Sequence, residues 1–254
     1  MANLLRFALL LFLAGAARAE WAVTASETER AAVAGVEHRR IVLAESETAA
    51  TAKLDLAFFS TKTATLRVID NPTGADDLAA VMLRTRGVAG VNGGYFDPQD
   101  TPLGLLISDG KLIAPLRKAR LLSGLIVVTK GRVELLRYAE YSPRKTATAA
   151  LQCGPFLVDG GNAVSGLNDT RSARRTFIMT SGADRVAVGF CSRVTLAELG
   201  DILATPRIVS DLKVQRALNL DGGSSSAFSF TGEGGPFSIR EQKRVRNFVV
   251  VAPK

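Results

Sequence analysis

The chain has 254 residues, of which 47% are hydrophobic, and a formal net charge of +8 at pH 7. This length corresponds to one large domain or two small ones, and the apolar content is ample for a packed core. Aromatic residues make up only 6% of the chain and do not interleave with a basic stripe, so the composition argues against nucleic acid as a partner.

Residues 1–19 have the features of a secretory signal peptide. Arg6 precedes an unbroken apolar run over 7–13, and residues 17–19 (Ala-Arg-Ala) fit the A-x-A rule for cleavage before Glu20. The run is shorter than the about 20 residues that a membrane-spanning helix needs; the alternative is an uncleaved anchor. No other stretch is long and apolar enough to span a bilayer. We therefore expect an exported protein, periplasmic or extracellular, without stable membrane insertion.

The charge that remains after residue 19 indicates the kind of partner. Residues 20–254 carry 30 basic and 24 acidic side chains, a net charge of +6. A moderately basic exported protein suits anionic envelope material, such as phosphodiester-linked glycans, teichoic-type polymers or lipid headgroups.

Strands and hairpins dominate the predicted secondary structure. Apolar and alternating patterns predict strands over 53–59, 63–69, 91–96, 149–158, 176–180, 186–191 and 247–251. Asp109-Gly110 and Lys130-Gly131 predict two hairpins, which join 105–107 to 111–113 and 124–128 to 132–136. A further tight turn is expected at 159–162 and an exposed loop at 142–148.

Helices are fewer. One is predicted over 76–86, with two aspartates in its first turn, and a second begins at the capping box Thr195 to Glu198 and extends to about Leu203. A third, short helix is expected over 211–216. The sequence therefore predicts a single α+β domain over 20–254, with a largely antiparallel or mixed β-sheet and a few helices.

The two cysteines, Cys153 and Cys191, lie in predicted strands. An even number of cysteines in an oxidising compartment allows a disulfide, and we expect these two to be bridged. The alternative is a pair of separate buried thiols.

His38 is the only histidine of the chain, and it lies in a predicted strand near the mature N-terminus. Any serine or cysteine mechanism that relies on histidine would have to use it, and a zinc site built from several histidines is excluded. We favour a structural role for His38, with its ring nitrogen hydrogen-bonded. Acid–base chemistry must then come from carboxylates, arginines or a hard metal ion.

Two segments, 91–97 and 217–226, share one pattern: an apolar strand that ends in Asn or Asp followed by paired glycines. Glycine lets the backbone approach a ligand closely, and a carboxylate or carboxamide at the end of a rigid strand is a common way to build a polar site. The candidate residues are Asn92, Gly93, Gly94, Tyr95 and Asp97 in the first segment, and Asn219, Asp221, Gly222, Gly223, Ser224 and Ser225 in the second.

The order of motifs resembles the phosphodiester glycosidase domain family. The resemblance is carried by Asn-Gly-Gly-Tyr-Phe at 92–96, Asp-Gly-Lys at 109–111, Cys-Gly-Pro at 153–155, Arg-Thr at 175–176, Thr-Leu-Ala-Glu-Leu at 195–199, and Ala-Leu-Asn-Leu-Asp-Gly-Gly-Ser-Ser-Ser at 217–226. It covers about residues 35–251. It implies an exported hydrolase that cleaves between the anomeric carbon of a sugar and a phosphate oxygen, and releases the sugar and a phosphomonoester.

Such chemistry needs a carboxylate and donors for the phosphate oxygens. We expect Asp221 to be the central carboxylate, with Asp97 as the second candidate and Arg175 as the phosphate clamp. Arg244 is a further cation candidate. Asn92 and Asn219 are expected to bind sugar hydroxyls or to orient a carboxylate, and Ser224 or Ser225 to add donors.

Each candidate also has a structural interpretation. Asp221 with its glycines, and Asp97 before Pro98, are both typical of tight turns, and Arg244 belongs to a charge run that suits a solvated face. Asp97, Asp221 and nearby carbonyls also suit Ca²⁺ or Mg²⁺, although the sequence contains no ligand run for a metal. A non-catalytic glycan- or anion-binding protein on the same fold is the alternative function.

Overall fold

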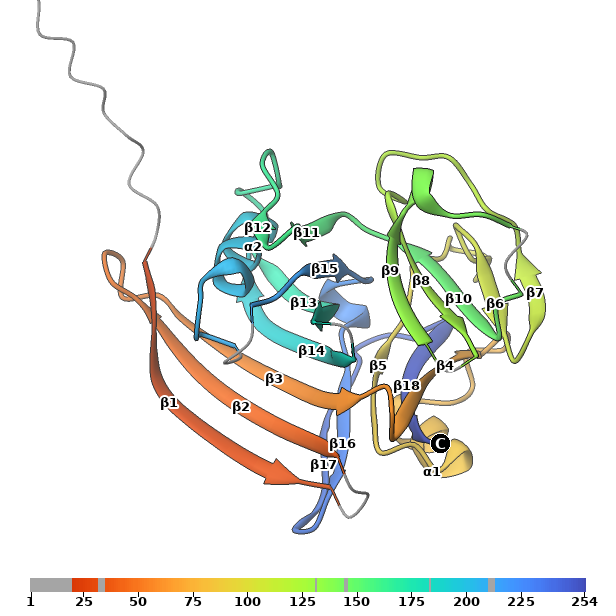
Figure 1. The fold of residues 1–254 in the computed structure, drawn as a ribbon, viewed down its shortest axis with the longest axis horizontal. Helices are drawn as coiled ribbons and strands as arrows, with labels where there is room; N and C mark the ends of the chain where they lie inside the picture. Colours follow the sequence, from red (N-terminus) through yellow and green to blue (C-terminus); the bar gives the residue numbers. More distant parts are fainter. Residues whose placement is uncertain (1–19, 32–34, 131, 144–145, 183, 210–212) are drawn as a thin grey trace, which may run out of the picture.

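A computed structural model describes residues 20–31, 35–130, 132–143, 146–182, 184–209 and 213–254. The described residues form three β-sheets (Figure 1). Within each sheet, all neighbouring strands pair in antiparallel orientation among the described residues. The prediction of a largely antiparallel α+β protein is therefore confirmed in outline, but the strands form three sheets and helices are a small part of the fold. The predicted signal peptide, residues 1–19, lies outside the described residues.

The largest sheet has eight strands. In spatial order they are β1 (Trp21–Arg30), β2 (Val36–Glu45), β3 (Thr51–Ser60), β14 (Arg185–Val194), β13 (Ala173–Ser181), β15 (Arg216–Asn219), β11 (Phe156–Asp159) and β12 (Asn162–Ala163). Sequence patterns did not predict β1, because nearly all of its side chains are exposed and its few apolar residues do not alternate with polar ones along the strand. Such a strand is typical of a protected sheet edge, where charged side chains oppose pairing with other molecules.

The other two sheets have five strands each. The second consists of β7 (Lys111–Ala114), β6 (Leu106–Ser108), β10 (Ala149–Cys153), β8 (Gly124–Thr129) and β9 (Arg132–Arg137). The third consists of β17 (Gly235–Ile239), β16 (Phe228–Gly232), β5 (Ala89–Asn92), β18 (Asn247–Pro253) and β4 (Ala64–Asp70). In Figure 1 the second sheet lies at the upper right and the third below it.

Two α-helices, α1 (Leu78–Thr85) and α2 (Leu196–Ala204), cover outer faces of the sheets. α2 begins at the predicted capping box, in which Thr195 and Glu198 bond each other's backbone N–H groups. α1 packs on the third sheet and α2 on the eight-stranded sheet. Neither helix, nor any other within the described residues, is long and apolar enough to cross a membrane.

The structure corrects the ends of several predicted elements. The strand expected over 91–96 ends at Asn92, and the strand expected over 149–158 is divided at Gly154-Pro155 into β10 and β11. The backbone of Gly154 has a φ of +151°, and a Cβ there would lie 2.6 Å from the Leu121 carbonyl oxygen, so glycine is needed at this crossing. Of the short helix predicted over 211–216, residues 213–215 are not helical and Arg216 begins β15, while 211–212 lie outside the described residues.

The main core lies where the eight-stranded sheet faces the two smaller ones. It includes Phe156 and Phe190 from the large sheet, Leu151 from the second and Phe228 from the third, all of them buried. A second core lies on the opposite face of the large sheet, under α2. Strands that contribute to both cores are apolar on both faces, which explains their almost continuous hydrophobic runs.

His38 lies in β2 and has the structural role predicted for it. Its Nε2 is 2.8 Å from Asp55 Oδ1, and the side chain is only 2% exposed. The imidazole ring packs against three phenylalanine rings of the third sheet at centroid distances of 4.9 to 5.1 Å. His38 therefore joins the first and third sheets.

The side chain of Asn92, at the end of β5, is a second connection between these sheets. Its Oδ1 accepts hydrogen bonds from Thr176 Oγ1 of β13 at 2.7 Å and from the Ala227 N–H at 3.0 Å. Its Nδ2 donates to the Asp221 carbonyl at 2.7 Å. The residue is fully buried, so all of these bonds form away from water.

The expected disulfide is wrong, because Cys153 and Cys191 are both free thiols. Cys153 ends β10 and belongs to the core between the sheets, whereas Cys191 in β14 points to the opposite face, into the core under α2. The eight-stranded sheet thus separates the two sulfur atoms. Burial raises the pKa of both thiols well above the ordinary value, so neither forms a reactive thiolate in the folded protein.

We expect both cysteines to react with a thiol reagent only after unfolding. Two thiols per chain should be labelled in denaturant without reductant, and none in the native protein over the same time. The melting temperature should not change when reductant is added. Labelling of no thiol in denaturant would show that a bridge exists.

We expect Asn92→Ala to lower the free energy of unfolding by about 2–4 kcal/mol, because it leaves the buried Thr176 hydroxyl and the Asp221 carbonyl without their partner. The control is Asn162→Ala, because Asn162 is exposed and its side chain bonds only the nearby Gly160 carbonyl. Its effect should stay within about 0.5 kcal/mol in the same urea titration. Equal effects of the two substitutions would contradict the role of Asn92 as a connection between sheets.

Candidate functional site

A hollow of about 350 Å³ lies where the strand ends of the large sheet meet the chain segments after β5 and β10. Its walls combine three charged side chains, those of Arg171, Arg175 and Asp221, with polar and apolar ones. The lining residues are Tyr95, Leu121, Pro155, Asn168, Arg171, Ala173, Arg175, Leu196, Asn219, Asp221, Gly222 and Gly223. Both motifs predicted from the sequence therefore contribute to one hollow, through Tyr95 and through the segment around Asp221.

Asp221 is held at this hollow by its own backbone. Its N–H donates to the Gly93 carbonyl at 3.0 Å, and its carbonyl accepts the hydrogen bond from Asn92. A Cβ on Gly93 would lie 2.0 Å from Asn247 Oδ1, so glycine is needed where this segment packs against Asn247 of β18. The predicted glycine motif after β5 is therefore used to position Asp221.

The carboxylate of Asp221 is partly withdrawn from water. Burial raises its pKa above the ordinary value, while three neighbours act in the opposite direction: the Ser225 hydroxyl, the Lys243 ammonium group and the Gly222 N–H. The Gly222 N–H donates to Asp221 Oδ1 at 2.9 Å. The fully buried Ser225 hydroxyl faces the carboxylate but lacks a hydrogen bond of standard geometry.

Arg175, in β13, is a buried cation at the same hollow and is only 8% exposed. Its Nε donates to the Val194 carbonyl at 3.0 Å and its Nη2 to the Arg171 carbonyl. No carboxylate forms an ion pair with it among the described residues. Its Nη1 lies near Gly222, 3.8 Å from the position of a Cβ there, and has no hydrogen bond within the described protein.

Tyr95 and Asn219 form a hydrogen-bonded wall of the hollow. The Tyr95 hydroxyl donates to the Gly154 carbonyl at 2.5 Å, and Asn219 Nδ2 donates to the Tyr95 oxygen at 3.1 Å. Burial, with the nearby Cys153 and Asp221, raises the pKa of Tyr95 far above its ordinary value, so the phenol stays neutral. Asn219 is 2% exposed, and its Oδ1 has no hydrogen-bond partner.

Several residues predicted for the site do not line the hollow. Asn92, Gly93 and Gly94 lie behind it; Gly94 N–H, for example, donates to Asn247 Oδ1 at 2.7 Å. Ser224 is exposed beyond Gly223, and its carbonyl accepts from the Gln242 N–H.

Two further candidates, Asp97 and Arg244, also lie outside the hollow. Asp97 Oδ1 accepts from the Gln99 and Thr101 N–H groups at 2.9 and 2.8 Å, the pattern of a turn-forming aspartate. Arg244 is exposed, and its aliphatic part lies over the Gly74 turn. Neither side chain is therefore brought together with Asp221.

The site residues that sequence analysis missed include four from loops: Leu121, Asn168, Arg171 and Lys243. The first three line the hollow, and Lys243 is close enough to lower the Asp221 pKa; its Nζ lies 4.9 Å from the centre of the Phe96 ring. No local motif distinguishes them, because they come from loops that only the tertiary structure brings to the hollow. The basic run 243–246 was considered, but the structure brings Lys243 rather than Arg244 near Asp221.

The described residues do not form a metal-binding cluster. No three His, Cys, Asp or Glu side chains come together within the described part of the chain. The two carboxylates considered for Ca²⁺ or Mg²⁺ are separate, because Asp97 supports a turn away from the hollow. The donor set at Asp221 is a single carboxylate beside a lysine, which does not fit a divalent cation.

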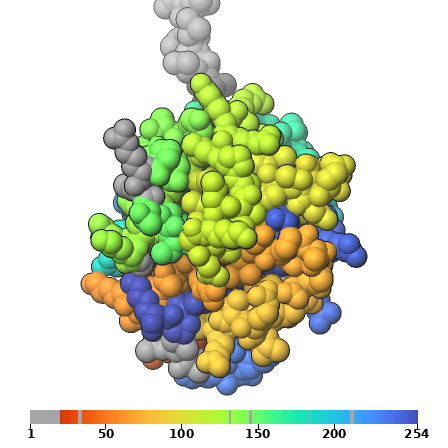
Figure 2. All heavy atoms as spheres, turned by 90° about the vertical axis from the view of Figure 1, so that its right-hand side faces the viewer, coloured from red at the N-terminus to blue at the C-terminus, as the bar shows by residue number. Residues whose placement is uncertain are grey.

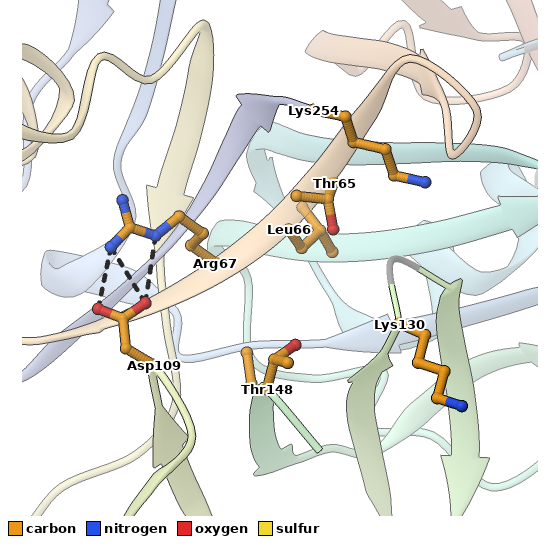
Figure 3. Close-up of a pocket in the computed structure, with 8 residues that line it drawn as sticks. Thr65, Leu66, Arg67, Asp109, Lys130, Thr148 and Lys254 are labelled. Carbon is orange, nitrogen blue, oxygen red and sulfur yellow. Dashed lines mark hydrogen bonds and ion pairs between the residues drawn. The ribbon is translucent and has the colours of Figure 1, made fainter. Parts of the chain in front are cut away.

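A second hollow, of about 390 Å³, differs from the first in its chemistry (Figure 3). Its arginine, Arg67, makes a double hydrogen bond to Asp109 at 2.9 and 3.0 Å, and the Lys254 ammonium group donates to the Thr61 carbonyl. Arg67 and Lys254 already have partners, and the third cation, Lys130, is exposed. The carboxylate of Asp109 is exposed and bound by Arg67. The hollow at Asp221 is therefore the better candidate for a reactive site.

Comparisons with known structures show the same fold in three other proteins. The zebrafish N-acetylglucosamine-1-phosphodiester alpha-N-acetylglucosaminidase catalytic domain, described as auto-inhibited by its pro-peptide, is 14% identical; the match covers 90% of this chain and 88% of that chain, with a TM-score of 0.66. Two further structures are also similar. A hypothetical protein from Synechocystis is 15% identical; the match covers 87% of this chain and 62% of that chain, with a TM-score of 0.58. A putative exported protein from Burkholderia pseudomallei is 12% identical; the match covers 81% of this chain and 75% of that chain, with a TM-score of 0.55.

No curated protein matches the sequence itself. The profile of the phosphodiester glycosidase family, however, matches residues 85–252, about two thirds of the chain. This region includes both glycine motifs and every residue that lines the hollow at Asp221. The chain therefore belongs to the phosphodiester glycosidase family.

Proposed function

We propose that this protein is an exported hydrolase that cleaves sugar-1-phosphodiesters of envelope or extracellular glycoconjugates. One observation carries the proposal: the buried guanidinium of Arg175 and the half-buried carboxylate of Asp221 line the same hollow and form no ion pair with each other. A buried cation without an ion-pair partner is costly, and an anionic ligand such as a phosphodiester would compensate for it. The family supports the reaction class, because its description names this linkage.

The reaction breaks the bond between the anomeric carbon and the bridging phosphate oxygen. Water supplies the hydroxyl group that joins the anomeric carbon, and the electron pair of the broken bond leaves with the phosphate. The products are the free sugar and a phosphomonoester. Phosphate is a good leaving group, so this hydrolysis needs less acid assistance than that of an ordinary glycoside.

Each wall of the hollow has a role in this scheme. Nη1 of Arg175 donates to a phosphate oxygen, and the exposed Arg171 provides a second cation on the same side. Asp221 acts on the anomeric centre as base or nucleophile, or stabilises its positive charge. The unpaired Asn219 Oδ1 accepts a hydrogen bond from a sugar hydroxyl or from the attacking water.

We expect Asp221→Asn to lower turnover of a sugar-1-phosphodiester by about 10³-fold or more, because the amide provides neither a base nor a negative charge. The assay measures free sugar released from UDP-N-acetylglucosamine and other sugar-1-phosphodiesters by the purified protein. The melting temperature of the variant should equal or exceed that of the wild type.

Full activity in Asp221→Asn would remove Asp221 from the mechanism and retain the reaction class. Saturable binding of these compounds without any product would instead favour the non-catalytic binding protein. Release of sugar by the wild type alone would support both the reaction and the role of Asp221.

We expect the raised pKa of Asp221 to appear in two pH profiles. If the ionised form is active, kcat/KM should fall as the pH decreases through this pKa, at a pH above the ordinary aspartate value of 3.8. A carboxyl group with a raised pKa holds its proton more tightly in the folded state, so its contribution to stability is present below 3.8 and is lost as the pH rises through the native pKa. Asp221→Asn should therefore gain stability relative to wild type over that range, and equal pH dependence of the two proteins would contradict this.

A further inference from the structure

The positive charge of the chain is concentrated in one part of the fold. Residues 104–153, which include the whole second sheet, carry nine basic and three acidic side chains. The remainder of 20–254 carries 21 of each, so its net charge is zero. In Figure 2 the yellow and green atoms of this region form the upper part of the face toward the viewer, above the orange and blue atoms of the third sheet.

Within this region the loop 117–122, here called the basic loop, is held rigidly by one side chain. Gln152 in β10 is 1% exposed and makes four hydrogen bonds. Its Oε1 accepts from the Leu105 and Arg117 N–H groups, both at 3.0 Å. Its Nε2 donates to the carbonyls of Arg117 at 2.6 Å and Leu122 at 2.9 Å, so both ends of the loop are fixed.

The three cations of the basic loop, Arg117, Lys118 and Arg120, are exposed, and none of them pairs with a carboxylate among the described residues. Other basic residues of the region do have partners: Arg137, for example, binds Asp159 at 2.6 Å. A fixed loop that holds unpaired positive charges in place lowers the entropic cost of binding an anion.

The basic loop also forms the boundary between two hollows. Leu121, which is 60% exposed, lines the hollow at Asp221. Lys118 and Arg120 line the next hollow, of about 630 Å³, together with Ser123 and Arg137. A chain that is bound at Asp221 and passes over Leu121 would therefore reach these cations.

We propose that the basic loop and the hollow beside it bind further phosphates of a polymeric substrate, so that the natural substrate is a glycan with repeated phosphodiesters. This inference rests on the proposed function, since it assigns the substrate class of the same site. A fixed cluster of positive charge raises the local concentration of a polyanion and accelerates its capture, an effect that salt weakens. A neutral glycan or a single small phosphodiester gains little from it.

The first test compares two substrates with the same scissile linkage, one with a single phosphodiester and one an oligomer of several. We expect Lys118→Gln/Arg120→Gln to lower kcat/KM for the oligomer by about five- to thirtyfold, mainly through KM, and to leave the single phosphodiester unchanged. The matched control is Arg30→Gln/Lys53→Gln, because both residues are exposed on the large sheet away from the hollow. Equal losses on both substrates, or no loss on the oligomer, would overturn the proposal.

The second test does not depend on turnover. Binding of labelled poly(glycerol phosphate) to the wild-type protein should weaken with salt and should weaken in the loop variant but not in the control variant. If no substrate is hydrolysed but the loop variant binds the polymer more weakly than the wild type and the control variant do, the proposed role of the basic loop is supported and the proposed function fails. If hydrolysis occurs but the loop variant binds and cleaves as wild type, only the loop proposal fails. Binding to phosphatidylglycerol vesicles without binding to the polymer would overturn it in favour of a membrane surface.

Discussion

A buried carboxamide at the end of β5 is the interaction on which much of this structure depends. Asn92 accepts from the large sheet through Thr176 and donates to the backbone of the Asp221 segment. A buried amide that lacks a hydrogen-bond partner lowers the stability of the folded protein. The hydrogen bonds of Asn92 therefore hold the two sheets and the Asp221 segment in one relative position. The neighbouring Gly93 accepts from the Asp221 N–H through its carbonyl, and its lack of a Cβ leaves room for the Asn247 side chain of β18. The family motif around Asn92 is thus explained as a support behind the site.

The site itself is electrostatically unfavourable in the free protein. Arg175 is buried with only carbonyl oxygens as hydrogen-bond partners, and partial burial raises the pKa of the Asp221 carboxyl group. Each group alone lowers the stability of the fold, as expected where function requires groups in unfavourable surroundings. An anionic ligand at the hollow would compensate for the burial of the Arg175 charge by placing a negative charge next to it. The cations of the basic loop differ, because they remain in water and lose little by having no partner.

The arrangement of the three sheets explains why the site lies where it does. The large sheet shares one face with both smaller sheets, and a hydrophobic core fills the space between them. The hollow occurs at the margin of this core, where strands end and polar backbone must find partners. β10 connects the regions, since Gln152 within it fixes the basic loop and Gly154 after it accepts from Tyr95.

The sequence by itself did not predict β1, β16 or β17, but it determined many of the strands, the two hairpins, the two helices and the two motifs that contribute Tyr95, Asn219 and Asp221 to the hollow. It did so because these features depend on local patterns: apolar periodicity, turn residues and caps. Only the tertiary structure decided the separation into three sheets and the placement of Cys153 and Cys191 on opposite faces of one of them. It also showed that Asn92 supports the site from behind and that Arg171 and Leu121 line it. These properties depend on contacts between residues far apart in the chain, and no local pattern specifies which of them will meet.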